Sequence, residues 1–336
     1  MARERIRSFD FVRAACTLGI VLNHFAIESH SEWLQRYLYE FPSGGGSLGY
    51  TLVTVFFLIS GCLLYLNHRE VPDVRAFYAK RWLSIYPSFY LAYLPALALY
   101  RLTNPSFFSD RRLRQLVFTL IGFDGYLAGR FRTWYILGEW FLGAIIICYL
   151  VYPLLSKAIE RSETGTLVVV SALFLVTMRW NMLGQHAFRN PFSCVFSFLV
   201  GMLICRHRLY ESRPLALGGL AVFLLFYVCP LSIPENIEYH VCGIALFFAL
   251  NALGGHVMRG LRAAKATDQV ARLSYEVFLV HHLTIIALIR IIAPTGPVGI
   301  LATLVASVAL SLVGAGVLSG ISRSVVKRIR STQKTA

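Results

Sequence analysis

Two ionisable side chains stand inside an apolar segment near the N-terminus. Between Phe9 and Phe25 the chain reads FDFVRAACTLGIVLNHF, with ten residues between Arg13 and His24. At about 100° and 1.5 Å per residue on a helix, this spacing puts both side chains on one face, roughly 16 Å apart. At membrane depth an ionisable group costs about 2.5–3.5 kcal/mol, which makes the pair a candidate functional site. A histidine that merely packs against another helix would also explain His24.

Three further ionisable side chains lie within apolar runs farther along the chain. Glu139 stands in the fourth run, and the adjacent pair His281 and His282 stands near the middle of the ninth. A histidine beside a carboxylate suits general-base chemistry, because the carboxylate orients the ring and stabilises the imidazolium. Two histidines and a carboxylate could also bind a metal ion. No HxxxH or HExxH spacing favours that alternative, and we expect no metal.

Basic and hydroxyl side chains complete the set of candidate residues. Arg81 opens the third run, with Arg75 and Lys80 just before it. Together with Arg13 these cations would form a basic funnel that suits phosphate groups, although ordinary anchoring at a membrane surface explains Arg75 and Lys80 equally well. Ser60 lies near the end of the stretch FFLISG in the second run, where no GxSxG elbow is present. We therefore expect it to pack or to line a substrate path, and not to act as a nucleophile.

The elements that must position these residues are membrane-spanning helices. Of the 336 residues, 57% are hydrophobic and only 15% are charged, far less charge than a water-soluble domain of this length carries. Apolar runs close to the length that crosses about 30 Å of hydrocarbon recur from end to end. We predict an all-α, polytopic integral membrane protein with about ten transmembrane helices. They are expected at 10–28, 47–66, 82–101, 134–153, 166–181, 192–205, 214–232, 239–256, 272–292 and 298–320.

The net charge of +15 follows the same topology. With the N-terminus inside, 21 of the 32 Lys and Arg residues fall on inner segments and eight on outer ones. This is the positive-inside pattern, and it predicts that both termini are cytoplasmic and excludes nucleic acid as the partner. The longest loop, 102–133, is placed outside and carries five arginines. It could hold an anionic or sugar acceptor, or it could be a plain solvated loop, and the short apolar stretch 113–122 within it reads as interfacial or re-entrant.

The seven cysteines all fall within predicted spans, form no CxxC pair and are odd in number. We interpret them as small apolar packing residues, and not as a disulfide framework or a metal site. The first apolar run lacks a small-residue cleavage site and is not a signal peptide. No internal repeat of the kind found in many transporters is evident.

Five short motifs, in order, resemble those of the membrane-bound acyltransferase-3 family. The first run is similar to the family's first helix, with its Asp-x-x-Arg start at Asp10 and its Arg-x10-His spacing, and FFLISG matches the family's FFxxSG. KRWLSIYP looks like the arginine-proline motif that opens the third helix. TWYILGEW, with Trp134 and Glu139, resembles a Trp-Ser-Leu-x-x-Glu segment. LSYEVFLVH, with Tyr275 and His281, resembles a late Ser-Tyr-x-x-Tyr-Leu-x-His motif. His282 has no counterpart in the family and reads as packing.

The resemblance implies an O-acyltransferase of surface glycans in which residues 1–322 form a single transmembrane domain and 323–336 a basic cytoplasmic tail, without an appended SGNH domain. It implies that Arg13 and Arg81 bind the phosphates of a cytoplasmic acyl-CoA, acetyl-CoA in the first place. His24, assisted by Glu139, would act as general base. Asp10, Ser60, Trp134, Tyr275 and His281 would line the substrate channel, with Tyr275 or His281 polarising the thioester carbonyl as an option.

The acceptor implied is a surface carbohydrate or a lipid-linked glycan, modified at the inner membrane of a bacterium. The resemblance does not decide between acetyl and succinyl transfer, or between direct attack and an acyl-enzyme on His24. It also leaves open which hydroxyl of the acceptor is modified and what the oligomeric state is. A proton-coupled transporter would also use buried His and Glu side chains, and a glycan flippase or polymerase would share the polytopic plan. Neither rival would turn over a thioester, and neither would depend on coenzyme A.

Overall fold

The computed structural model describes residues 5–43, 47–104, 109, 111–129, 131–138, 140–179 and 186–335. Within them the chain is helical apart from its loops and one isolated bridge between Glu40 and Ser47. The longer helices are α1 (Arg7–Glu28), α3 (Leu48–His68), α4 (Val74–Thr103), α8 (Trp140–Arg161), α9 (Glu163–Val176), α10 (Pro191–Arg206), α11 (Arg213–Val228), α12 (Glu235–Val257), α13 (Leu261–Arg272), α14 (Ser274–Ile292) and α15 (Gly296–Thr335). Shorter ones are α2 (Glu32–Leu38), α6 (Leu116–Leu120), α7 (Asp124–Leu127) and the 3-10 turns η1 (Leu113–Gln115), η3 (Ala187–Arg189) and η4 (Leu209–Glu211).

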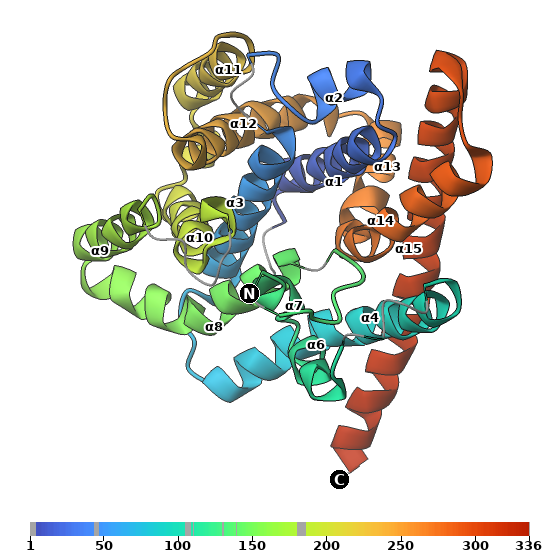
Figure 1. Cartoon of the computed structure of the whole chain (residues 1–336). Coiled ribbons are helices and arrows are strands. Elements are labelled where there is room, and N and C mark those ends of the chain that lie inside the picture. Colours follow the sequence, from blue (N-terminus) through green and yellow to red (C-terminus); the bar gives the residue numbers. More distant parts are fainter. Residues whose placement is uncertain are drawn as a thin grey trace.

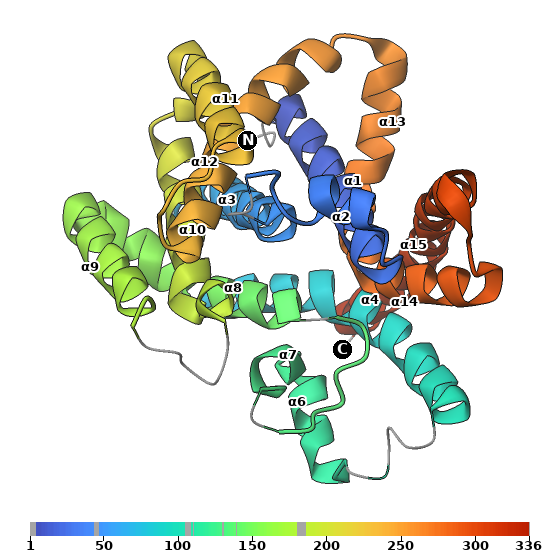
Figure 2. The ribbon, with the colours of Figure 1, turned by 45° about the horizontal axis from the view of Figure 1, so that its top comes forward.

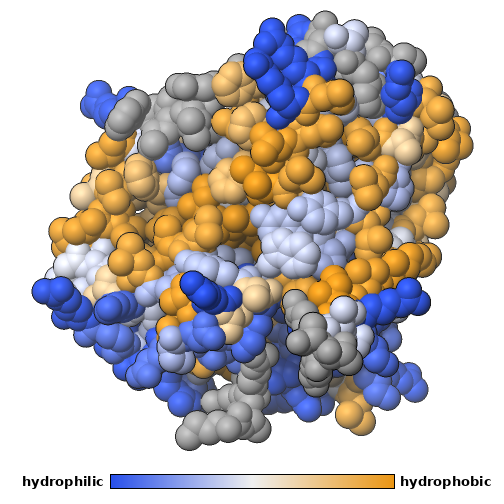
Figure 3. All heavy atoms as spheres, turned by 90° about the horizontal axis from the view of Figure 1, so that it is seen from below, coloured by the Kyte–Doolittle hydropathy of each residue, from blue (hydrophilic) through white to orange (hydrophobic). Residues whose placement is uncertain are grey.

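The helices confirm the prediction of a multi-pass, all-α membrane protein. Seven of them, namely α1, α3, α4, α8, α12, α14 and α15, are long and apolar enough to cross a membrane. Three more, α9, α10 and α11, are apolar but shorter. Each of these ten overlaps one predicted span, while the number that actually cross stays a prediction. Figure 3 shows an apolar band across one face of the molecule, with hydrophilic side chains gathered at its edges, as expected for a surface that faces lipid.

Helices α1 and α3 lie at the centre of the bundle (Figure 1). Helix α3 packs against α1, α10 and α12. Its contact with α10 is close because glycines face each other's backbone: a Cβ on Gly61 would overlap the carbonyl oxygen of Phe198, and one on Gly201 would overlap that of Leu58. Small residues at a helix crossing allow such an approach in a membrane, where packing, and not the hydrophobic effect, drives helix association.

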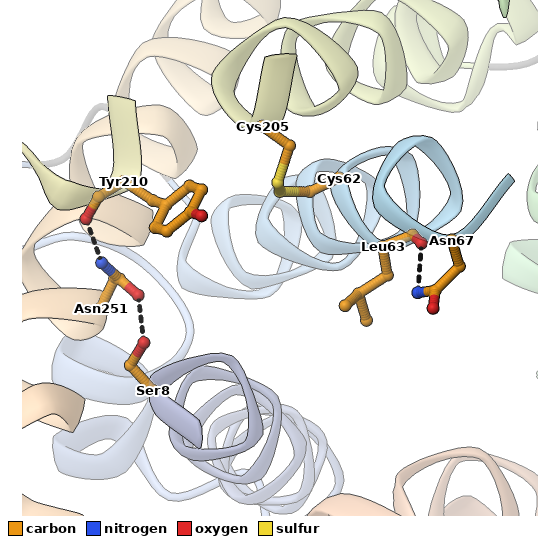
Figure 4. Close-up of a disulfide and its surroundings, with 7 residues drawn as sticks. All are labelled: Ser8, Cys62, Leu63, Asn67, Cys205, Tyr210 and Asn251. Carbon is orange, nitrogen blue, oxygen red and sulfur yellow. Dashed lines mark hydrogen bonds between the residues drawn. A yellow bond between two sulfur atoms is a disulfide. The ribbon is translucent and has the colours of Figure 1, made fainter. Parts of the chain in front are cut away.

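The same crossing joins two cysteines. Cys62 follows Gly61 on α3, Cys205 lies one turn beyond Gly201 on α10, and their sulfur atoms form a disulfide with 5.1 Å between the Cα atoms (Figure 4). The interpretation of all seven cysteines as unpaired packing residues is therefore wrong for this pair. Spacing along the chain carries no sign of the bond, because 143 residues separate the two cysteines and only the glycine-mediated approach of the helices brings them together.

Local sequence explains where several helices begin. The side chain of Asp73 accepts a hydrogen bond from the Ala76 amide at the start of α4, and Asn190 accepts one from Phe192 at the start of α10, where Pro191 occupies the first turn. Both residue types are preferred N-caps, and proline suits the first helical turn because its missing N–H would be unsatisfied anyway. The Asn190 cap also fixes the position of the backbone just before α10, where Arg189 lies.

Two segments differ from the expected loops. Helix α13 fills what the sequence suggested was an inner connection, and it lies on the opposite side of the molecule from α6 and α7 in both ribbon views (Figures 1 and 2). Helix α15 runs for 40 residues without a break through position 322, so the basic tail continues the last predicted span as helix. The apolar stretch 113–122 forms η1 and α6, with Leu113, Val117 and Leu120 exposed.

Candidate functional site

A cavity of about 810 Å³ runs through the bundle between α1, α3, α4, α8 and α14. Its lining includes Ser47, which caps the start of α3, and His68, the last residue of that helix. At 1.5 Å per residue this length of α3 is roughly 30 Å, about the thickness of the hydrocarbon core. The volume falls within the range of small-molecule sites in proteins. A path of this length could receive one substrate from each side of a membrane.

Six of the nine residues singled out from the sequence line this cavity: Arg13, His24, Ser60, Arg81, Tyr275 and His281. They come from four helices, α1, α3, α4 and α14, that lie far apart in the chain. Glu139 lies outside the described residues, so its place beside His24 stays a prediction. Asp10 and Trp134 are described and are not among the lining residues. The sequence motifs therefore converge on one cavity.

One end of the cavity, called here the histidine end, holds the three imidazoles of His24, His281 and His282. The His24 ring centroid lies 5.0 Å from that of His281 and 5.3 Å from that of His282. His282 was interpreted as packing, yet its Nε2 lies 3.9 Å from Oε1 of Glu28, and both side chains line the cavity. Glu28 is thus a carboxylate at the histidine end that the sequence did not suggest.

The backbone fixes the tautomer of His281. Its Nδ1 lies 2.9 Å from the Val277 carbonyl oxygen and 3.0 Å from that of Phe278. A carbonyl only accepts, so in the neutral ring Nδ1 carries the hydrogen and Nε2 carries the lone pair. That Nε2 is buried and has no hydrogen-bond partner within the described part of the chain. His281 is therefore suited to accept a proton or a hydrogen bond, and unsuited in this form to donate one to a thioester carbonyl.

Among the residues that the structure describes, no group of three or more His, Cys, Asp or Glu side chains is arranged to hold a metal ion. The three imidazole rings meet edge to face, and the lining near them includes the aromatic side chains of Phe141 and Phe278 as well as the carboxylate of Glu28.

The other end of the cavity, called here the arginine end, holds two guanidinium groups. Arg13 donates a hydrogen bond of 3.1 Å from Nη2 to Oγ of Ser274. Arg81 lies between two aromatic rings, with its Cζ 5.8 Å from the centroid of Phe77 and 5.7 Å from that of Tyr149. Its Nε is buried without a hydrogen-bond partner among the described residues. Guanidinium groups placed by aromatic rings and short of acceptors are suited to bind phosphates.

Asp10 and Trp134 have structural partners away from the cavity. The carboxylate of Asp10 accepts a 2.8 Å hydrogen bond from Arg5, which also forms an ion pair of 2.7 Å with Asp268 on α13. These contacts tie the start of α1 to α13, and the two carboxylates raise the pKa of Arg5.

The indole Nε1 of Trp134 donates to the Arg112 carbonyl at 3.2 Å and so closes the 102–133 loop onto the start of the next segment.

That loop contains a buried carboxyl group and packs closely against the start of α8. Asp124 is fully buried and accepts a 2.6 Å hydrogen bond from Thr119, while burial raises the pKa of its carboxyl to about 6. The neighbouring Gly125 approaches the backbone of Trp140 so closely that any Cβ would overlap it. The loop thereby sets the start of α8, where Trp140 enters the wall of the cavity.

Arg189 is a lining residue that reasoning from the sequence assigned only to an outer loop. It ends the 3-10 turn η3, directly before the Asn190 cap of α10. Its Cζ lies 5.0 Å from the ring centroid of Trp140 and 5.9 Å from that of Tyr50. The run Arg-Asn-Pro signals the start of a helix, but nothing in the sequence indicates that the arginine turns inward.

Comparison with known proteins identifies a family to which the chain is similar. A family model described as an acyltransferase domain, that of the acyltransferase-3 family, matches residues 6–316, which include all nine residues singled out from the sequence. No curated protein and no solved structure matches the chain.

Proposed function

We propose, from the premise that this chain belongs to the acyltransferase-3 family, that it moves an acyl group from cytoplasmic acyl-CoA to a hydroxyl of a surface or lipid-linked carbohydrate. Membership of the family establishes a membrane acyltransferase. The donor, the acetyl group and the carbohydrate acceptor are proposals. The observation that carries them is one cavity with guanidinium groups at one end and imidazoles at the other.

The arginine end suits the donor. Arg13 and Arg81 present cationic groups in the cavity, and within the described part of the chain neither forms an ion pair with an acidic residue. Phosphates of acyl-CoA would supply the missing counter-charge. Arg13 and His24 lie on one helix, α1, about 16 Å apart by helical rise, a separation that suits the extended arm between the nucleotide and the thioester. Ser60 and Tyr275 line the path between the two ends.

The histidine end suits the chemistry. The acceptor hydroxyl oxygen would attack the thioester carbonyl carbon while its proton passes to a ring nitrogen of His24. The C–S bond then breaks, and coenzyme A leaves as a thiolate that takes up the proton, which gives an ester and free coenzyme A. His281, whose Nε2 offers a lone pair, would accept a hydrogen bond from the His24 ring or from the acceptor hydroxyl. This is direct transfer, without an acyl-enzyme.

Topology supports the sides assigned to the two substrates. If the termini are cytoplasmic, as the basic residues predict, the arginine end opens toward the pool of acyl-CoA and the histidine end toward the outer half of the membrane. An O-acetyltransferase of this kind would modify a polysaccharide repeat or a lipid-linked glycan at a bacterial inner membrane. A lipid-linked acceptor would fit a site bounded by membrane lipid.

The test is transfer of labelled acetyl from acetyl-CoA in membrane vesicles that contain the protein, supplied with a carbohydrate extract of the bacterial envelope. His24→Ala is compared with His256→Ala, which removes an exposed histidine that does not line the cavity. We expect label in carbohydrate with wild type and His256→Ala, and little with His24→Ala. No release of coenzyme A with any extract would contradict the proposed donor and favour a transporter.

A further inference from the structure

Arg189 brings a third guanidinium group into the cavity, away from the arginine end. Its backbone is held by two local devices: Arg189 closes the turn η3, and Asn190 caps α10 at the next position. The side chain extends from this anchored position over both rings of the Trp140–Tyr50 pair, whose centroids lie 6.4 Å apart. His24 lines the same cavity. The guanidinium is therefore held at a fixed position in the cavity wall, where it can contact a bound ligand.

Within the described residues, the guanidinium of Arg189 meets no counter-charge. Its Nε is buried and has no hydrogen-bond partner, and Arg189 forms no ion pair within the part of the chain that the structure describes. Two aromatic faces lower the cost of burying the cation but do not satisfy its N–H groups. A buried guanidinium normally meets a carboxylate or a phosphate, because only such groups accept two parallel N–H bonds. The open acceptor position is therefore one that a bound anion would fill.

The surroundings suit a sugar ring. Tyr50 and Trp140, which flank Arg189, both line the cavity, and Tyr50 is itself held by a stacked contact of 5.4 Å with His186 and by Tyr239 at 5.0 Å. Rigid aromatic side chains of this kind offer a flat apolar face beside a polar edge. A carbohydrate presents the same combination of an apolar ring face and polar substituents.

We infer that Arg189 binds the anionic group, a carboxylate or a phosphate ester, of an acidic carbohydrate acceptor whose ring lies against Trp140 and Tyr50. The inference rests on the proposed function, because it assigns the acceptor to the class of acidic sugars. It also separates two anion sites in one cavity, with the donor phosphates at Arg13 and Arg81 and the acceptor anion at Arg189. Docking at Arg189 brings the acceptor into the chamber that contains His24.

Equilibrium binding to the purified protein in lipid nanodiscs, without any acyl donor, tests the inference. One pair of probes is a tetrasaccharide of alternating glucuronate and N-acetylglucosamine and the same tetrasaccharide with its carboxylates reduced to hydroxymethyl groups. The other pair is glucose 6-phosphate and glucose. We expect the charged member of at least one pair to bind about 10- to 100-fold more tightly than its neutral partner. The pair that shows the preference identifies the anionic group as carboxylate or phosphate.

The preference must depend on Arg189. In Arg189→Gln it should disappear, in Arg189→Lys it should persist in weaker form because the charge stays and the planar fork is lost, and in Arg179→Gln it should match wild type. Arg179 is an exposed arginine on the same connection between α9 and α10 that does not line the cavity, so it controls for charge alone. The Arg189→Lys variant also guards against a loss caused by misfolding of Arg189→Gln.

Several results would overturn the inference. They are equal binding within both pairs, no saturable binding of either charged probe at millimolar concentration, a preference that survives in Arg189→Gln, and an equal loss in Arg179→Gln. Failure of the proposed function is separate: a protein that prefers acidic probes through Arg189 but never transfers acetyl from acetyl-CoA would contradict the acyl transfer alone. A protein that transfers acetyl without any preference for acidic probes would contradict the Arg189 site alone.

Discussion

The two ends of the cavity carry different kinds of polar group. At the arginine end, Arg13 and Arg81 are permanent cations that can bind an anion but do not release a proton at ordinary pH. At the histidine end, His24, His281 and His282 carry imidazole rings, whose nitrogens can accept or donate a proton. Binding and proton transfer are thus assigned to separate places along one path. Helix α1 sets their distance, because it carries Arg13 and His24 on one face.

This difference teaches that the two ends should fail in different ways. Loss of a group at the arginine end should weaken the affinity for the donor and leave the chemical step intact. Loss of the base at the histidine end should slow the chemical step and leave donor affinity intact. If every variant instead weakened donor affinity and slowed the chemical step to the same extent, the cavity would act as one undivided site.

The largest effect is expected for His24→Gln. Loss of the general base should lower the rate of acetyl transfer by about 10²- to 10⁴-fold, while the KM for acetyl-CoA should change by less than about twofold. Initial rates of coenzyme A release at several donor concentrations give both values. His256→Gln provides the matched control. A His24→Gln protein with an unchanged rate and normal folding would show that another group takes the proton.

At the arginine end, Arg81→Gln should weaken binding of the acyl donor. The buried Nε of Arg81 has no hydrogen-bond partner among the described residues and lies near the rings of Phe77 and Tyr149, so the variant would lose the charged donor proposed to bind phosphate. We expect the KM for acetyl-CoA to rise about 10- to 100-fold with little change in the rate at saturating donor. Lys80→Gln removes the adjacent exposed cation and should behave as wild type. An equal rise in both variants would reduce Arg81 to a surface anchor.

A smaller effect is expected for Arg13→Lys. The ammonium keeps the charge but loses the planar fork that donates to Ser274 and that, in the proposed function, would also donate to a phosphate oxygen. Donor affinity should fall by about 2- to 10-fold, the value of one net hydrogen bond. Isothermal titration of coenzyme A into the detergent-solubilised protein measures it. Unchanged affinity would remove Arg13 from the phosphate site.

The buried carboxyl of the 102–133 loop gives the smallest effect on activity and a clear effect on stability. Because burial raises the pKa of the Asp124 carboxyl from 3.8 to about 6, the folded state holds its proton more tightly than the unfolded state. This carboxyl therefore stabilises the fold below about pH 4, and its contribution is lost as the pH rises toward 6. Thermal unfolding at pH 4.5 and 7.5 should show a decline of about 2 kcal/mol from this group, and a smaller decline in Asp124→Asn. An identical decline in both proteins would contradict the assignment.

The sequence predicted the helices and six of the residues that line the cavity. Apolar length alone located ten helices, since membrane spans need about 20 apolar residues. The Arg-x10-His spacing placed Arg13 and His24 on one face because helical geometry is regular. These properties are local, so the chain reveals them without knowledge of its neighbours.

Contacts between distant segments could not be predicted in the same way. The Cys62–Cys205 disulfide depends on the approach of two helices through Gly61 and Gly201. The inward turn of Arg189 and the place of His282 beside Glu28 depend on how α10 and α14 rotate about their axes. Such rotations are set by packing in three dimensions, and single-residue patterns do not report them.

The central claim is that donor binding and proton transfer occupy different ends of one cavity, and equilibrium binding of tritiated acetyl-CoA tests it most directly. Wild type, His24→Gln and Arg81→Gln are compared in nanodiscs without acceptor. The account predicts saturable binding with the same affinity in wild type and His24→Gln, and affinity weakened by about 10-fold or more in Arg81→Gln. Absence of saturable binding in wild type, or equal loss in both variants, would contradict it.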